Sequence, residues 1–86
     1  MFRSDLTIIN KTGLHARPAA ELALMCRQFN CELRVINGNA VINPKNIISI
    51  LAGRVKQGDS VVLEAEGSDE EEAGNAIAGF IKNLKD

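Results

Sequence analysis

The stretch best suited to chemistry is Gly13-Leu14-His15-Ala16-Arg17-Pro18, which holds the chain's only histidine. Pro18 favours the first turn of a helix and the following alanines are strong helix formers, so His15 is expected at a helix start. Unpaired backbone amides and the positive end of the helix dipole meet there, and both stabilise anions. The same field favours the neutral imidazole, whose free nitrogen lone pair is a nucleophile. A lone histidine is more often a surface residue or a satisfied polar group, but with these neighbours His15 can take up a phosphoryl group, held by the backbone amides of Ala16 and Arg17 and by the Arg17 guanidinium.

Length and composition indicate one small domain over residues 1–86. A net charge of −1 and the lack of Trp and Tyr argue against a nucleic-acid surface. No apolar run reaches the length of a membrane span, and residues 1–5 lack the apolar core of a signal peptide. We therefore expect a cytoplasmic protein that binds no nucleic acid and does not insert into membranes.

The two cysteines, Cys26 and Cys31, are expected as free thiols, because disulfides are rare in cytoplasmic proteins. Cys26 falls on the apolar face of the first predicted helix, as a small buried hydrophobe. A metal site would need both thiols to converge on His15, yet Cys26 lies about three helical turns away. We expect no metal ion and no other cofactor.

Hydrophobic periodicity predicts the element order β-α-β-β-α-β-α. Alternating apolar residues place strands at 2–9, 32–36, 40–42 and 61–66. Helical spacing places helices at 16–29, 47–52 and 69–84. The expected fold is an α+β open-faced sandwich, in which the two longer helices cover one face of a four-stranded antiparallel sheet.

Turn and cap residues mark the boundaries of these elements. Asn37-Gly38 predicts a type I′ hairpin turn, because both residues tolerate a positive φ. Asn46 is the expected N-cap of the short helix, and Gly53 is expected to end it. Ser68 with Glu71 predicts a capping box for the last helix.

Two predicted helices carry apolar residues that the core does not account for. Ala20 and Leu24 fall on a different face of the first helix from its core stripe, and the short helix is apolar on more than one face. The short helix is either wedged into the core or part of a surface that meets a partner. The docking patch, as the name is used below, consists of Ala20, Leu24, Ile47, Ile48 and Leu51.

The segment Gly13-Leu14-His15-Ala16-Arg17-Pro18-Ala19 resembles the active-site segment of the HPr family. These are the histidine-containing phosphocarrier proteins of the bacterial phosphoenolpyruvate-dependent sugar phosphotransferase system. The segment from Val41 to Leu51 resembles the family's second signature, and the likeness runs from about Phe2 to Leu84. The resemblance implies the same open-faced sandwich and a carrier protein rather than an enzyme.

The resemblance also implies a reaction sequence. Phospho-Enzyme I, charged by phosphoenolpyruvate, would phosphorylate His15 at Nδ1, and the group would pass to an EIIA protein or domain in sugar uptake. One surface must then fit two partners, which favours the docking patch with a positive rim from Arg17 and Arg27. The carrier is expected to be a monomer.

Two residues depart from the family pattern. Asn46 stands where many members have a regulatory serine, so it can cap a helix but offers no hydroxyl for phosphorylation. Arg54 stands where the family often has glycine, while Gly53 comes one residue earlier. The end of the short helix is therefore expected to differ from that of other members.

Other functions remain open on the sequence. The chain fits a carrier of the related nitrogen-regulatory branch, a protein-binding module whose histidine is never phosphorylated, or an enzyme with His15 as general base. The enzyme is disfavoured because no Ser or Cys nucleophile lies near the histidine and the chain is short for a substrate pocket. The binding module is disfavoured because His15, Arg17 and Pro18 occur together.

Overall fold

The computed structural model describes residues 1–85. Its four strands are β1 (Phe2–Thr7), β2 (Glu32–Asn37), β3 (Ala40–Ile42) and β4 (Ser60–Glu66). They form one sheet in the order β1-β4-β2-β3, and all neighbouring pairs are antiparallel. The helices are α1 (Ala16–Cys26), α2 (Ile47–Ala52) and α3 (Glu70–Lys82), so the predicted element order is confirmed.

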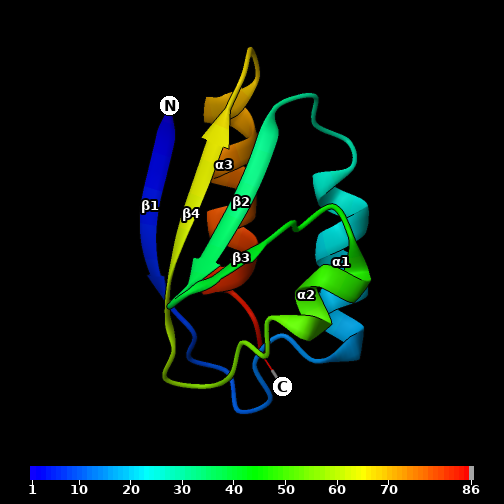
Figure 1. The fold of residues 1–86 in the computed structure, drawn as a ribbon, viewed down its shortest axis with the longest axis vertical. Coiled ribbons are helices and arrows are strands. Elements are labelled where there is room, and N and C mark those ends of the chain that lie inside the picture. The colour runs from blue at the N-terminus through cyan, green and yellow to red at the C-terminus, as the bar shows by residue number, and fades with distance from the viewer. Residues whose placement is uncertain (86) are drawn as a thin grey trace.

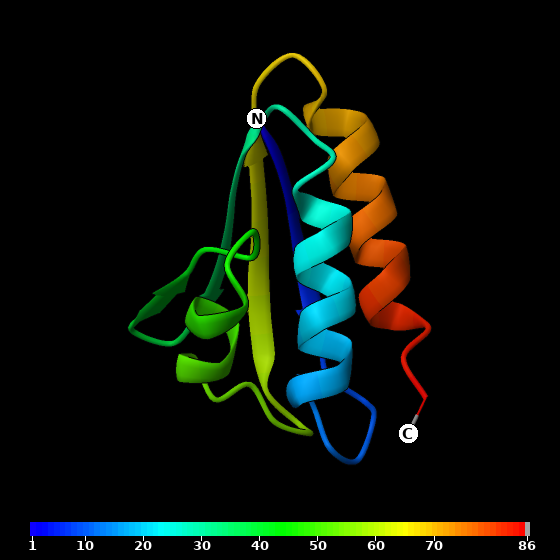
Figure 2. The same ribbon diagram turned by 90° about the vertical axis from the view of Figure 1, so that its right-hand side faces the viewer.

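Helices α1 and α3 cover one face of the sheet, and the opposite face is open (Figures 1 and 2). The short helix α2 packs beside α1, near the edge of the sheet formed by β3 (Figure 1). This arrangement is the open-faced sandwich predicted from the sequence. It brings the start of α1 and the whole of α2 to the same side of the molecule.

The core lies between the sheet and the two long helices. Every second residue of the strands faces it, and each fully buried aliphatic side chain contributes about 1.5–3 kcal/mol. The buried apolar residues of the strands and of the two long helices are Leu6, Leu33, Val35, Ile42, Val61, Leu63, Ala65, Ala19, Leu22, Ala23, Cys26, Ala73, Ile77, Ala78 and Ile81.

Three elements are shorter than predicted, among them α3, which covers Glu70–Lys82 instead of 69–84. Helix α1 ends at Cys26 rather than at Phe29, because the amides of Gln28 and Phe29 donate to carbonyls only three residues back, at 3.1 and 3.2 Å. Such bonds tighten the last turn and end the α-helix. Strand β1 ends at Thr7 rather than at residue 9, although the next residue, Ile8, still faces the core.

The hairpin between β2 and β3 differs from the predicted type I′ turn. Asn37 pairs with Ala40, so the two loop residues are Gly38 and Asn39. Only Gly38 has a positive φ, of 61°. A type I′ turn needs a positive φ at both loop residues, whereas a type II′ turn needs it only at the first. The register of the sheet therefore selects a type II′ pattern.

The predicted capping box of the last helix is also wrong. The N-cap of α3 is Asp69 rather than Ser68. The Asp69 carboxylate accepts from the backbone amides of Asn30 at 2.8 Å and Cys31 at 2.9 Å instead of capping its own helix. The tertiary contact therefore competes with the local cap, and it ties the start of α3 to the chain that enters β2.

Candidate functional site

His15 is the N-cap residue of α1, with extended backbone angles of φ −79° and ψ −171°. Its side chain makes no capping hydrogen bond and is exposed. Within residues 1–85, no hydrogen bond or ion pair holds the ring. Both ring nitrogens are therefore accessible to a reagent from solvent.

The first turn of α1 offers two free backbone amides. Pro18 lies in this turn and has no N–H, and the amide of Ala19 already donates to the carbonyl of His15 at 2.9 Å. The amides of Ala16 and Arg17 have no acceptor in the part of the chain that the structure describes. An anion on the His15 ring would meet these two N–H groups and the positive end of the helix dipole.

The loop before His15 is held rigidly against the chain that follows α2. Gly13 has a φ of 60°, and a Cβ there would lie 2.7 Å from the Cα of Lys56. The amide of Leu14 donates to the carbonyl of Val55 at 3.1 Å, and the side chain of Leu14 is buried. The Asn10 side-chain amide donates to the Gly13 carbonyl at 2.8 Å. These contacts set the position from which His15 faces solvent.

A pocket of about 310 Å³ lies beside the histidine. Lys85 and Leu84, from the chain after α3, line it together with residues of the first turn of α1. Two cations and one carboxylate therefore border this space. Its lining residues are Thr12, His15, Arg17, Pro18, Glu21, Leu84 and Lys85.

The site residues predicted from the sequence did not include Leu84 and Lys85. No local pattern marks these two residues, because their place beside His15 depends on how α3 packs against α1.

The residues of the docking patch lie on neighbouring faces of α1 and α2. Leu24, Ile48 and Leu51 are 63, 74 and 42 % exposed, whereas Ala20 and Ile47 are half-buried. Ile50 is fully buried in the core. The short helix is thus wedged into the core by its inner side, and its outer side remains uncovered, as the predicted partner surface requires.

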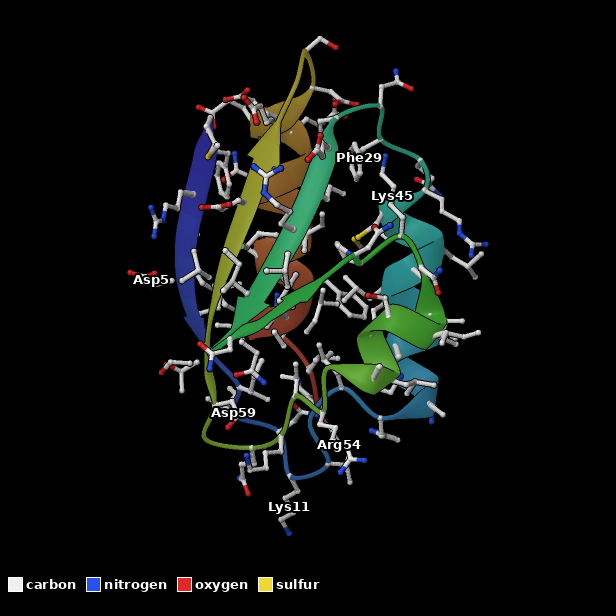
Figure 3. The ribbon with its side chains drawn as sticks, viewed as in Figure 1. Asp5, Lys11, Phe29, Lys45, Arg54 and Asp59 are labelled. Carbon is white, nitrogen blue, oxygen red and sulfur yellow. The ribbon has the colours of Figure 1, made fainter. Side chains whose placement is uncertain are left out.

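The predicted rim residue Arg27 has a structural contact as well. Its Nε donates to the carbonyl of Lys45 at 2.8 Å, and the Lys45 ammonium donates to the carbonyl of Phe29, also at 2.8 Å. Figure 3 shows Lys45 beside Phe29. These bonds join the end of α1 to the loop before α2 and hold the two halves of the docking patch together.

The residues that cap the two ends of α2 are those predicted from the sequence. Asn46 is the N-cap, and its side-chain oxygen accepts from the amides of Ile48 at 2.8 Å and Ser49 at 3.3 Å. The Ser49 hydroxyl accepts from the amide of Asn43 at 2.9 Å, so it stabilises the same turn. Gly53 is the C-cap but has a right-handed φ of −71°.

The left-handed position after α2 is occupied by Arg54, with a φ of 52°. Glycine is the usual residue there, and an L-residue in this conformation costs about 1–2 kcal/mol. The short helix is thus followed by a left-handed arginine directly after a right-handed glycine.

Within residues 1–85 the two thiols are free, and the side chains form neither a metal site nor a membrane-spanning helix. Cys26 and Cys31 are buried and unpaired with each other, and burial raises the pKa of the Cys26 thiol to about 12. Among residues 1–85, no three His, Cys, Asp or Glu side chains gather as a metal ion would require. None of the helices in that range is long and apolar enough to cross a membrane.

An open-faced sandwich that presents one unpartnered histidine at a helix start, beside an exposed apolar patch, defines a small histidine-carrier protein. The chain belongs to the HPr family of the phosphotransferase system: the family model described as "PTS HPr component phosphorylation site" matches residues 2–83. The resemblance seen in the sequence is thereby confirmed.

Individual relatives are similar over nearly their whole length. The phosphocarrier protein HPr of Mycoplasma pneumoniae is 36 % identical, with 95 % of this chain and 94 % of that protein covered. A crystal structure of HPr from Thermoanaerobacter tengcongensis has a TM-score of 0.91 and 43 % identity, covering 95 % of this chain and 92 % of that one. The crystal structure of Crh from Bacillus subtilis, described as a swapped dimer, has a TM-score of 0.76 and 30 % identity, covering 95 and 94 %.

Proposed function

We propose that His15 is the phosphoryl acceptor of this HPr-family carrier and that it reacts through Nδ1. The observation that supports this most directly is the exposed, unpartnered ring at the N-cap of α1, next to the free amides of Ala16 and Arg17. The lone pair of Nδ1 attacks the phosphorus of a donor phosphohistidine. The new P–N bond forms as the old one breaks, and the electron pair of the broken bond returns to the donor imidazole.

Arg17 stabilises the phosphoryl group once it is attached. Its guanidinium has no partner within residues 1–85, so it is free to donate two hydrogen bonds to phosphoryl oxygens. The site is exposed to solvent, so the added stabilisation stays moderate. A carrier needs that balance, because a group held too tightly would not be passed on.

The proposed partners are Enzyme I as donor and an EIIA protein or domain as acceptor, and the protein acts as a carrier rather than an enzyme. Both would bind through the docking patch, with Arg17 and Arg27 as positive rim charges that steer partners with acidic surfaces. This proposal is supported by the exposed Leu24 on α1 and Ile48 on α2, two helices that pack against each other. The carrier would act in the cytoplasm, as a single domain.

The primary test is intact-mass measurement after incubation with phosphoenolpyruvate, magnesium and Enzyme I, beside a His15→Ala variant. One acid-labile, alkali-stable phosphoryl adduct on the parent and none on the variant is the expected result. An adduct on both proteins would place the phosphoryl group on another residue. Absence of an adduct with every donor tried would favour a binding module.

Sugar uptake is the proposed branch, supported by curated relatives that carry the name HPr. The nitrogen-regulatory branch uses the same chemistry with a different donor. Parallel phosphorylation by the two kinds of Enzyme I decides between them: a faster reaction with the sugar-type donor is expected, and a faster reaction with the nitrogen-type donor would reverse the assignment.

A monomer is the proposed active form, although related structures include an HPr dimer from T. tengcongensis and the swapped dimer of Crh. Light scattering at micromolar concentration should give the mass of one chain, 9.3 kDa. A stable species of twice that mass would instead indicate a dimer like those of the relatives.

A further inference from the structure

Arg54 has a left-handed backbone conformation. Among residues 1–85 it is the only residue other than glycine with a positive φ. The preceding residue, Gly53, has no such strain, although glycine would fit the left-handed position better. The chain thus carries a destabilising residue at a position where the side chain has no packing role, since Arg54 is exposed. Strain that persists in this way often serves a functional site.

The position of Arg54 relative to His15 is set by the backbone. The hydrogen bond from the amide of Leu14 to the carbonyl of Val55, 3.1 Å long, joins the two segments. Arg54 directly precedes Val55, and His15 directly follows Leu14, so each is next to a member of the bonded pair. Figure 3 shows Arg54 near the lower end of the molecule, and in the same view of Figure 1 α1 begins toward that end.

The guanidinium of Arg54 is also unoccupied. Three of the chain's five arginines are tied to partners: Arg3 to Glu64 at 3.8 Å, Arg34 to Glu64 at 3.0 Å, and Arg27 to a backbone carbonyl. Within the described chain, the two others have no hydrogen bond or ion pair. These two are Arg17, which follows His15 by two residues, and Arg54, which precedes the Val55 that is bonded to Leu14.

We propose that Arg54 is a second phosphoryl-binding arginine, which closes the anion site from the side of α2 and donates to phosphoryl oxygens when His15 is phosphorylated. The inference rests on the proposed function. A guanidinium is well suited to the task, because it stays charged and its planar donors match phosphate oxygens. Glycine at this position would leave the phosphoryl group without this second guanidinium.

The test loads the full chain without any partner protein. Phosphoramidate transfers its phosphoryl group to an imidazole nitrogen as its own P–N bond breaks and ammonia leaves, and the chain has one histidine. The pH at which the attached phosphoryl group takes up a proton is then read from its 31P chemical shift. A nearby cation stabilises the dianion, so it lowers this midpoint.

Arg54→Gly should raise the midpoint by about half a pH unit, as expected for losing one positive charge roughly 6 Å away in a solvent-exposed site. In Arg54→Lys the pH midpoint of the phosphoryl group should stay nearly as low as in the parent protein. Arg3→Gln removes the same charge from the second residue of β1, close to the N-terminus, which lies at the opposite end of the molecule from the start of α1 (Figure 1), and should leave the midpoint unchanged. An Arg54→Gly midpoint equal to that of the parent would overturn the proposal.

Folding is controlled in the same samples. Arg54→Gly should raise the thermal midpoint of unfolding, because it relieves the left-handed strain, so a changed phosphoryl midpoint would not come from unfolding. If Arg54→Gly instead slows transfer from Enzyme I while the phosphoryl midpoint stays fixed, Arg54 contacts the partner and the proposal is wrong. If the parent accepts phosphoramidate but no Enzyme I, the proposed function fails, and the midpoint comparison still decides the role of Arg54.

Discussion

The backbone N–H of Leu14 donates to the carbonyl oxygen of Val55 at 3.1 Å, and both side chains are buried. This bond joins the loop that presents His15 to the chain that leaves α2. The backbone that carries the histidine is therefore tied to the chain that follows the docking-patch helix α2.

Replacing Gly13 tests how much that unit depends on close packing. In Gly13→Ala, the new Cβ would lie 2.7 Å from the Cα of Lys56 and closer still to the carbonyl of Val55, in a backbone with a φ of 60°. Strain and steric conflict together should lower the free energy of unfolding by at least about 2 kcal/mol. Urea denaturation measures the change, and phosphorylation of His15 should slow in parallel.

Gly38→Ala is the matched control for Gly13→Ala. Its φ of 61° is nearly the same, but a Cβ there would meet no atom within 4 Å. Gly38→Ala should lower the free energy of unfolding only by the cost of the left-handed conformation, about 1 kcal/mol. Equal losses in the two variants would show that contact with residues 55 and 56 is unimportant.

A charge in the docking patch should weaken partner binding without unfolding the protein. Ile48 suits this test better than Ile47, because Ile48 is 74 % exposed while Ile47 packs against the core. Ile48→Glu should lower kcat/KM for phosphorylation by Enzyme I about tenfold, since burial of one such side chain contributes about 1.5–3 kcal/mol. Loading by phosphoramidate should be unaffected.

Val41→Glu provides the comparison for Ile48→Glu. Val41 is 66 % exposed on β3, outside the docking patch, and the substitution adds the same charge. The kcat/KM for phosphorylation of Val41→Glu by Enzyme I should equal that of the parent protein. The patch is wrongly assigned if Ile48→Glu reacts as fast as Val41→Glu.

The N-cap of α2 should be stabilising in its own right. Asn46→Ala removes the acceptor for the amides of Ile48 and Ser49 and should lower the free energy of unfolding by about 1 kcal/mol. Asn46→Ser should be nearly neutral, because serine caps helices about as well. A urea series on the three proteins checks this, and an unchanged Asn46→Ala midpoint would mean that the cap contributes nothing.

Acid should destabilise the protein partly through Asp69. The amide of Asn30 first, and the contacts with Cys31 next, lower the pKa of Asp69 below its ordinary value of 3.8. Because the folded pKa is the lower one, this stabilisation is complete above pH 3.8 and is lost as the pH falls through the folded value. Urea midpoints between pH 5 and pH 2 should therefore fall less steeply in Asp69→Asn than in the parent.

Asp5→Asn is the control for the acid series. Asp5 is exposed on β1, and within the described residues its carboxylate accepts no hydrogen bond. Its urea midpoints should follow the parent's pH dependence. A slope for Asp69→Asn identical to that of Asp5→Asn would rule out the contribution of Asp69.

The sequence by itself determined the features that depend on neighbouring residues. The alternation in residues 61–66, the N-cap at Asn46 and the helix start after His15 are all present as predicted. Each arises from interactions within a few residues, such as side chain to backbone caps and the burial of every second strand residue. The element order and the class of fold follow from the same local patterns.

Only the tertiary structure decided which distant segments share a surface. Lys85 lines the His15 pocket because α3 packs beside α1. The Asp69 carboxylate accepts from the amides of Asn30 and Cys31 and does not cap its own helix. Arg54 belongs to the segment next to the histidine loop because the amide of Leu14 donates to the carbonyl of Val55. None of these contacts leaves a periodic or compositional trace, since each depends on the packing of elements far apart in the chain.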